Sequence, residues 1–178
     1  MIFGERIRLR AIERSDLPQF VLWLNDPDVY KSLLIYLPLS QSEEEIWYEN
    51  MLKRPKDEHP MVIEIKQEDG WVAIGNCGFI NIDWRCRSGD VGIFIGEKRL
   101  WNHGYGTEAM RLLLKHGFNT LNLNRVALDV YATNSGGIRS YEKAGFIHEG
   151  AKREAVFCDG QYIDLLQMSV LKKEWESG

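Results

Sequence analysis

The stretch of sequence that decides the fold is Arg99-Leu100-Trp101-Asn102-His103-Gly104-Tyr105-Gly106-Thr107-Glu108-Ala109. It follows a short apolar run, 90–95, whose length fits a buried strand, and it leads into an amphipathic run that extends to Phe118 and predicts a helix. Gly104 and Gly106 remove two Cβ atoms from the turn between these elements, so backbone N–H groups can approach an anion closely. Because a helix N-terminus also carries partial positive charge, the turn is predicted to hold a pyrophosphate without a lysine.

Two glycines in such a turn are weak evidence by themselves, because they can simply tighten the passage from strand to helix. The stretch is not a Walker loop, since Gly-Lys-Ser/Thr is absent, and it is not a dinucleotide fingerprint, since the third glycine is absent. A nucleoside-triphosphate enzyme built on this glycine loop is an alternative interpretation, and the missing lysine argues against it.

Residue periodicity around this stretch predicts one mixed α/β domain over residues 1–178, with no internal repeat or linker. The segment 28–39 is ambiguous, and the alternation of Arg6 to Ile12 predicts an edge strand. Helices are expected at 17–24, from Ser40 or Ser42 to Leu52, at 106–118 and at 135–143. Strands are expected at 6–12, 61–65, 71–82, 90–95, 126–130, 146–156 and 162–171.

The charge balance limits the classes of partner. Lys and Arg number 22 and Asp and Glu number 26, which gives a net charge of −4 without long blocks of either sign. Broad binding to nucleic acid or to an anionic membrane needs a basic face, so neither is expected. The balance mildly favours cationic partners.

Several features of the sequence indicate a cytoplasmic protein. Charged residues interrupt the first twenty positions, so no signal peptide is expected. The most apolar run, 33–39, is broken by Tyr36 and Pro38 and is too short to span a bilayer. Cys77, Cys86 and Cys158 have no C-x-x-C spacing and are interpreted as reduced thiols, and no metal site is predicted.

A second segment, 134–146, identifies a family. It places Tyr141 seven residues after Asn134 and ends in Gly145-Phe146, about thirty residues after the W-x-x-G-x-G of the glycine loop. This combination resembles the GNAT superfamily of N-acetyltransferases, in particular the branch that holds ribosomal-protein N-terminal and spermidine acetyltransferases. The resemblance runs nearly end to end, from the Arg-Leu-Arg strand to Leu171-Lys172-Lys173-Glu174-Trp175.

The resemblance implies an α/β fold of the mixed α+β kind: a splayed mixed sheet of about seven strands with helices on both faces. Two central parallel strands part, and acetyl-coenzyme A lies in the gap. The resemblance also implies a homodimer. In the usual pattern Gln or Arg stands at the first motif position and Gly-Lys follows; this sequence has Trp101 there, followed by Asn102 and His103, so contact from a lysine side chain is lost.

The expected contacts with the coenzyme follow from this match. The N–H groups of Asn102 to Thr107 hold the pyrophosphate, the strand end pairs with the pantetheine arm, and Asn134 either reaches that arm or caps the next helix. Arg139 and Lys143, one helical turn apart, either meet the adenosine phosphate or form a solvated face. The candidate coenzyme-binding residues are Phe94, Ile95, Trp101, Asn102, His103, Gly104, Tyr105, Gly106, Thr107, Asn134, Arg139 and Lys143.

Tyr141 is the candidate general acid, because a neutral phenol can protonate the departing coenzyme thiolate. The alternative is a core tyrosine that packs against the sheet. Asp90 and Glu97 flank the central strand and are the candidate general bases, with Glu64 as a third; each of them fits a surface charge as well. Backbone N–H groups of the segment 94–96 are expected to stabilise the oxyanion.

The predicted activity is acetyl transfer by direct attack of a primary amine of a protein N-terminus, a polyamine or an amino sugar such as an aminoglycoside. Acceptor choice is expected in the segments 24–51 and 157–162. The acidic residues of the first segment would suit a cationic acceptor: Asp26, Asp28, Glu43, Glu44 and Glu45. The alternative is a non-catalytic acyl-CoA-binding sensor or scaffold, against which the presence of both Tyr141 and Asn134 argues.

Overall fold

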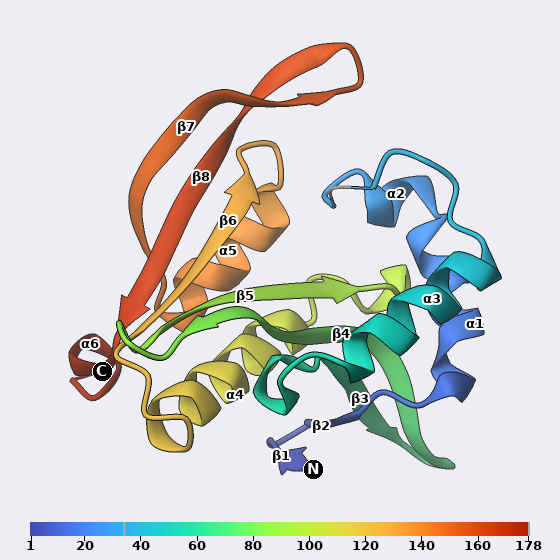
Figure 1. Cartoon of the computed structure of the whole chain (residues 1–178), viewed down its shortest axis with the longest axis horizontal. Coiled ribbons are helices and arrows are strands. Elements are labelled where there is room, and N and C mark those ends of the chain that lie inside the picture. The colour runs from blue at the N-terminus through green and yellow to red at the C-terminus, as the bar shows by residue number, and fades with distance from the viewer. Residues whose placement is uncertain (34, 178) are drawn as a thin grey trace.

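The computed structural model describes residues 1–33 and 35–177, which form an eight-stranded sheet in the order β1-β2-β3-β4-β5-β6-β8-β7 (Figure 1). The strands are β1 (Ile2–Phe3), β2 (Ile7–Ala11), β3 (Met61–Gln67), β4 (Gly70–Asp83), β5 (Ser88–Ile95), β6 (Arg125–Tyr131), β7 (Ile147–Cys158) and β8 (Gln161–Leu171). The helices are α1 (Leu17–Leu24), α2 (Pro27–Tyr30), α3 (Gln41–Leu52), α4 (Tyr105–Asn119), α5 (Ser135–Ala144) and α6 (Lys172–Trp175). In the part of the chain that is described, no helix has the length and apolar character needed to cross a membrane.

The predicted mixed α/β fold is confirmed, with one more strand than expected. The additional strand is β1, whose Ile2 and Phe3 pair with Leu9 and Arg8 of β2. The prediction that residues 6–12 form an edge strand is therefore wrong, because β2 lies between β1 and β3. The ambiguous segment 28–39 begins within a single turn of helix, α2, and its residue 34 lies outside the described residues.

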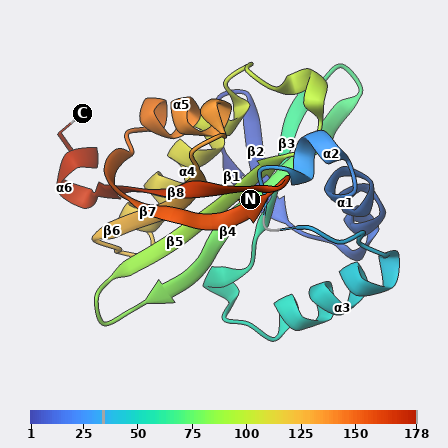
Figure 2. The same ribbon diagram turned by 90° about the horizontal axis from the view of Figure 1, so that it is seen from above.

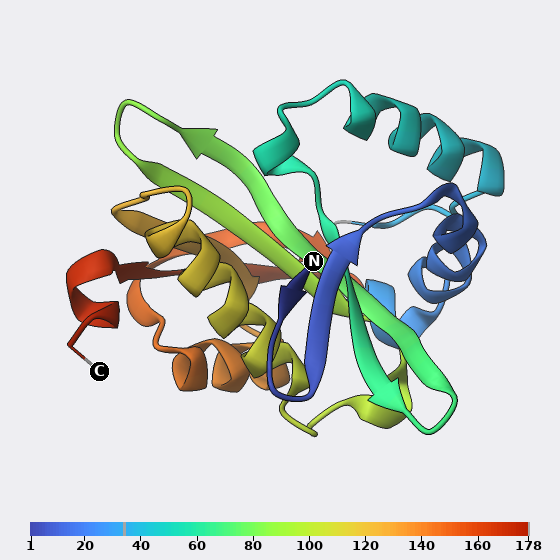
Figure 3. The ribbon, with the colours of Figure 1, turned by 90° about the horizontal axis from the view of Figure 1, so that it is seen from below.

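Helices cover both faces of the sheet, because successive side chains along a strand point to opposite faces and are apolar on both. Val91, Ile93 and Ile95 of β5 pack into the core with α4 and α5. Phe94, between them, points to the opposite face and packs against Phe20 and Trp23 of α1. Figures 2 and 3 show α4 and α5 on one side of the sheet and α1 and α3 on the other.

The centre of the sheet divides. All neighbouring strands are antiparallel except β5 and β6, which are parallel and pair only at Ser88–Arg125, Gly89–Val126 and Asp90–Ala127. After Asp90 and Ala127 the two strands diverge, a point we call the fork. Strands β6, β8 and β7 continue as an arm that rises away from β5 (Figure 1).

Candidate active site

A cavity of about 1120 Å³ opens at the fork. It is lined by β5, the turn before α4, β6 and α5, and also by residues of α2 from the other side of the sheet. The structure brings together all the predicted catalytic and coenzyme-binding residues except Glu64, Glu97 and His103, which do not line the cavity. Those that line it are Asp90, Phe94, Ile95, Trp101, Asn102, Gly104, Tyr105, Gly106, Thr107, Asn134, Arg139, Tyr141 and Lys143.

The turn before α4 presents unpaired backbone donors to this cavity. The helix begins at Tyr105, and its first intrahelical bond runs from the N–H of Glu108 to the carbonyl of Gly104. The N–H groups of Tyr105, Gly106 and Thr107 therefore precede the helical hydrogen bonds and point out of the positive end of the helix. Gly104 has φ +85°, a left-handed conformation that glycine adopts without strain. This arrangement suits a pyrophosphate.

The second glycine of the motif has a packing role. A Cβ on Gly106 would stand 3.3 Å from the hydroxyl oxygen of Ser140 on α5. Beside it, the hydroxyl oxygens of Thr107 and Ser140 lie 2.9 Å apart and share a hydrogen bond. The absence of a Cβ thus lets the N-terminus of α4 lie close against α5, so both helices border one cavity.

An ion pair and hydrogen bonds from the bend between β1 and β2 hold this turn in place. One carboxylate oxygen of Glu108 accepts the N–H groups of Glu5, Arg6 and Ile7 at 2.9, 2.9 and 3.3 Å. The other accepts Nε of Arg6 at 2.9 Å, and Nη1 of Arg6 donates to the carbonyl oxygen of His103 at 3.0 Å. Sequence reasoning missed Arg6, because no local pattern connects positions about a hundred residues apart.

The indole and imidazole of the turn have internal partners. Trp101 donates its Nε1–H to the carbonyl oxygen of Ile95 at 2.8 Å, which ties the turn to the end of β5. The Nδ1 of His103 lies 2.8 Å from the carbonyl oxygen of Trp101, and its ring stacks on Tyr105. His103 thus lies outside the cavity and shapes the turn.

At the end of β5, one backbone N–H faces the gap. The N–H of Gly96 donates to the carbonyl oxygen of Ile74 on the β4 side at 2.8 Å. Successive N–H groups along a strand point to opposite edges, so Phe94, two residues before Gly96, also directs its N–H toward β4. By this alternation the N–H of Ile95, paired with Gly75, points away from β4 toward the gap. Within the segment 94–96, only the N–H of Ile95 is directed toward the gap.

Helix α5 contributes a cap, a phenol and two cations. The side-chain oxygen of Asn134 accepts the N–H of Gly137 at 2.9 Å, which is the capping role expected as one of two alternatives. A Cβ on Gly137 would stand 2.6 Å from the amide nitrogen of Asn134, so the glycine leaves room for this cap. Arg139 and Lys143 line the cavity, where their charge complements an anionic ligand.

Tyr141 is held in a largely apolar setting. Its ring packs edge-on against Phe146, with the ring centroids 6.0 Å apart, and borders the core under α4 and α5. Burial raises the pKa of the Tyr141 phenol to about 12, so the hydroxyl is protonated at neutral pH. No side chain or backbone group in residues 1–33 and 35–177 forms a hydrogen bond with this hydroxyl, and Tyr141 lines the cavity.

The three candidate bases lie in different surroundings. Asp90 stands at the fork itself, lines the cavity and has no ion pair within the described part of the chain. Glu97 accepts Nε of Arg99 at 3.0 Å, and this hydrogen bond lowers the pKa of its carboxyl group. Glu64 is buried between two guanidinium groups on β2, those of Arg8 and Arg10. Of the three, only Asp90 has access to the cavity.

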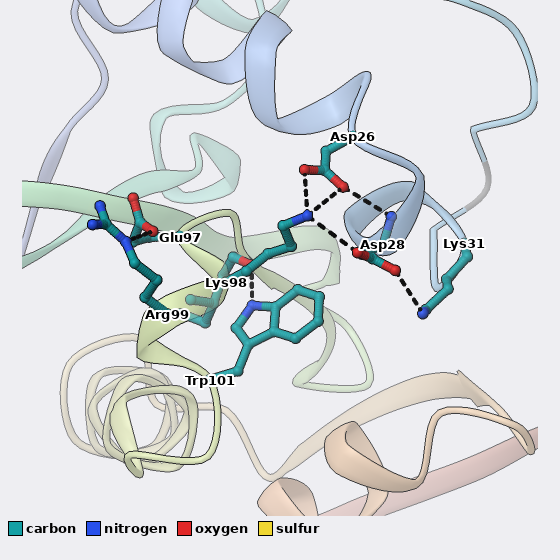
Figure 4. Close-up of polar contacts among 8 residues, drawn as sticks. Asp26, Asp28, Lys31, Glu97, Lys98, Arg99 and Trp101 are labelled. Atoms are coloured by element: carbon teal, nitrogen blue, oxygen red, sulfur yellow. Dashed lines mark hydrogen bonds and ion pairs between the residues drawn. The ribbon is translucent and has the colours of Figure 1, made fainter.

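Two of the five acidic residues expected to attract a cationic acceptor are already ion-paired. Asp26 and Asp28 share the ammonium of Lys98, and Asp28 also pairs with Lys31 (Figure 4). The remaining three lie on α3: Glu43 caps the helix, Glu44 is buried and Glu45 is exposed. Of the five, Asp28 alone lines the cavity, and residues 157–162 do not line it.

Comparison with known proteins agrees with this geometry. The family model described as "Acetyltransferase (GNAT) domain" matches residues 6–147. An uncharacterized N-acetyltransferase p20 of Bacillus licheniformis is 30% identical over 176 residues, which cover 98% of this chain and 97% of that protein. The putative ribosomal N-acetyltransferase YdaF of Bacillus subtilis is 36% identical over 103 residues, 56% of each chain.

Among solved structures, spermidine N-acetyltransferase from Vibrio cholerae in complex with CoA and spermine superposes with a TM-score of 0.87. Its sequence is 26% identical, and the match covers 97% of this chain and 99% of that chain. The likeness therefore extends over both the sheet and the arm that frame the fork.

Proposed function

The chain belongs to the GNAT acetyltransferase family, and from this premise we propose how its cavity carries out the reaction. The protein is an acetyl-CoA-dependent N-acetyltransferase that transfers an acetyl group to an amine. One observation supports the roles that we assign to these residues. A single cavity is bordered by the N–H groups at the start of α4, the N–H of Ile95 and the Tyr141 hydroxyl.

The residues at the fork fit the coenzyme. The amides of Tyr105, Gly106 and Thr107 bind the pyrophosphate, and Arg139 and Lys143 bind the remaining phosphate charge. The coenzyme supplies an acetyl group activated as a thioester. Ile95 donates its N–H to the acetyl carbonyl oxygen as negative charge develops there.

The acceptor amine must lose a proton to react. An amine with a pKa of about 10.4 is neutral in only about one molecule in 2,500 at pH 7. Asp90, at the fork and without an ion pair among the described residues, attracts the ammonium and accepts its proton directly or through water. A carbon–nitrogen bond forms as the carbon–sulfur bond breaks.

Tyr141 then protonates the leaving sulfur. A phenol with a pKa of about 12 is an unfavourable donor to an exposed thiolate. The apolar surroundings that raise the pKa of Tyr141 also destabilise the thiolate anion, so the two affinities for the proton approach each other. Tyr141 recovers its proton from Asp90 through solvent, which balances the cycle.

The acceptor is a primary amine of a protein N-terminus, a polyamine or an amino sugar. The putative ribosomal N-acetyltransferase and the spermidine N-acetyltransferase among the similar proteins support the first two classes. The experiment is to measure thiol release from acetyl-CoA with a peptide, spermidine and an aminoglycoside, and to identify the products by mass spectrometry. Saturable coenzyme binding without thiol release from any amine would instead support a non-catalytic acyl-CoA-binding module.

We also propose that residues 1–178 act as a single domain in the cytoplasm, as a homodimer. The continuous sheet from β1 to β7 supports the first point. The edge strand β7, whose side chains are largely exposed, offers a surface for a second copy. Light scattering after size-exclusion chromatography tests the assembly, and a monomer at micromolar concentration would contradict it.

A further inference from the structure

Lys98 connects two segments that approach the cavity from different sides. It lies in a single 3-10 turn, Lys98–Leu100, directly after β5. Its ammonium nitrogen is 2.8 Å from Oδ2 of Asp26 and 3.1 Å from Oδ2 of Asp28, at the start of α2 (Figure 4). The loop that follows the coenzyme-side strand therefore holds a segment about seventy residues earlier in the chain.

The held segment needs such support. Helix α2 has only four residues, and so short a helix is not stable by itself. Asp26 caps it by accepting the N–H of Asp28 at 2.9 Å, and Val29 is buried. Five residues of the segment line the cavity: Asp28, Val29, Lys31, Ser32 and Leu33. The position of α2 thus determines the shape of one cavity wall.

This wall lies on the side of the cavity where we expect the acceptor amine to enter. The turn that suits the pyrophosphate belongs to α4, and α4 and α5 cover one face of the sheet. Helix α2 follows α1, which packs on the opposite face with Phe94. An amine that attacks from the side opposite the coenzyme meets α2 first.

We propose that Lys98 is a positioning residue that holds α2 against the cavity and thereby sets the affinity for the acceptor amine. The inference rests on the proposed function, because it needs an amine to enter beside α2. At its other end the same loop is anchored by Trp101, whose indole donates to the carbonyl oxygen of Ile95. Lys98 therefore couples the acceptor wall to the end of the strand that binds the acetyl group.

The charges around Lys98 explain how this one side chain can hold α2 in position. A single exposed ion pair contributes little to stability. Lys98, however, separates two carboxylates that repel each other, and its hydrogen bonds lower the pKa of both Asp26 and Asp28. Without Lys98 the two negative charges at the start of α2 lose their shared cation, and Lys31 pairs with only one of them.

The test compares Lys98→Met with Lys98→Arg and with the matched control Arg99→Met. Arg99 belongs to the same turn, but its side chain is 88% exposed and, among the described residues, pairs only with Glu97. For Lys98→Met we expect faster hydrogen–deuterium exchange in residues 26–33 and about a 10-fold rise in the KM for the amine, with kcat and the Kd for coenzyme A retained. Lys98→Arg should restore the wild-type exchange rate and the wild-type KM for the amine. Arg99→Met should match the wild type in both.

Hydrogen–deuterium exchange and thiol release distinguish failure of this proposal from failure of the proposed function. Unchanged exchange in residues 26–33 of Lys98→Met overturns the positioning role, even if the wild type acetylates no amine. Faster exchange with an unchanged KM overturns the link to the acceptor. A rise in the Kd for coenzyme A as large as the rise in the KM for the amine overturns the assignment of α2 to the acceptor side of the cavity. Thiol release by the wild type tests the proposed function separately.

Discussion

The guanidinium of Arg6 donates a hydrogen bond to the backbone carbonyl oxygen of His103 at 3.0 Å, although the two residues are 97 positions apart in the sequence. The same guanidinium pairs with Glu108 and lies 4.8 Å from the centroid of the Tyr105 ring. Arg6 thus contacts the turn at His103, before α4, and the first turn of α4 at Glu108. A turn whose amides must all face one anion gains affinity when it is rigid before the ligand binds.

Arg6→Met is expected to weaken coenzyme binding without affecting the chemical step. Loss of the Arg6 contacts lets the turn move, so the Kd for coenzyme A should rise about 10-fold while kcat at saturating acetyl-CoA changes little. Isothermal titration calorimetry gives the Kd. Arg85→Met, at the exposed tip of the β4–β5 hairpin, is the control and should bind normally. An unaltered Kd in Arg6→Met would show that the turn keeps its shape unaided.

Tyr141→Phe should lower kcat about 100-fold, the effect expected for a lost general acid. Phenylalanine keeps the ring contact with Phe146, so the fold and the Kd for coenzyme A should be retained. Steady-state thiol release measures kcat, and calorimetry measures the Kd. Equal kcat values in the two proteins would assign the proton to water.

The pH dependence follows from the pKa of Tyr141. A general acid works only while protonated, and a phenol with a pKa of about 12 stays protonated throughout the range in which the enzyme can be assayed. The acceptor amine becomes reactive as it loses its proton, with a pKa of about 10.4. We therefore expect kcat/KM to rise with pH up to about pH 9 without a descending limb. A decline between pH 7 and 9 would contradict the high pKa.

Two substitutions distinguish Asp90, which lies within β5, from Glu97, which follows the strand. Asp90→Asn removes the unpaired charge at the fork and should lower kcat/KM for the amine at least about 10-fold. Glu97→Gln breaks only the surface pair with Arg99, so its kcat/KM should stay near the wild-type value. The reverse order of the two effects would place the proton acceptor at Glu97.

The elements around the fork were predictable because their signals are local. The apolar run of β5, the glycines before α4 and the spacing from Asn134 to Tyr141 each lie within a short window. Resemblance to a family then supplied their arrangement in space. The capping role of Asn134 could be predicted because it depends on a residue three positions away.

The contacts that sequence reasoning missed join distant positions. Nothing near Lys98 in the sequence points to Asp26, and nothing near Arg6 points to His103. The sequence pattern did not distinguish Asp90 from Glu97 as the candidate base. The register of β5 against β6 places Asp90 at the fork. The short helix α2 escaped prediction because tertiary contacts, rather than its own propensity, hold it.

Glu44 provides a test of the fold that does not depend on catalysis. Glu44 of α3 is only 4% exposed, and burial raises the pKa of its carboxyl group to about 7 from its ordinary value of 4.5. The folded state therefore binds a proton that the unfolded chain releases at lower pH. The stability that this proton confers is complete below about pH 4.5 and is lost as the pH rises toward 7.

Glu44→Gln removes this titration and should raise the free energy of unfolding at pH 8 by about 1–3 kcal/mol, with little gain at pH 4.5. Urea denaturation at both pH values measures the difference. Glu45→Gln, one position along the same helix and exposed, should change the stability equally little at either pH. A Glu44→Gln protein that is no more stable than the wild type at pH 8 would mean that water or a local rearrangement solvates the carboxylate, since a buried, unsolvated charge must destabilise the folded state.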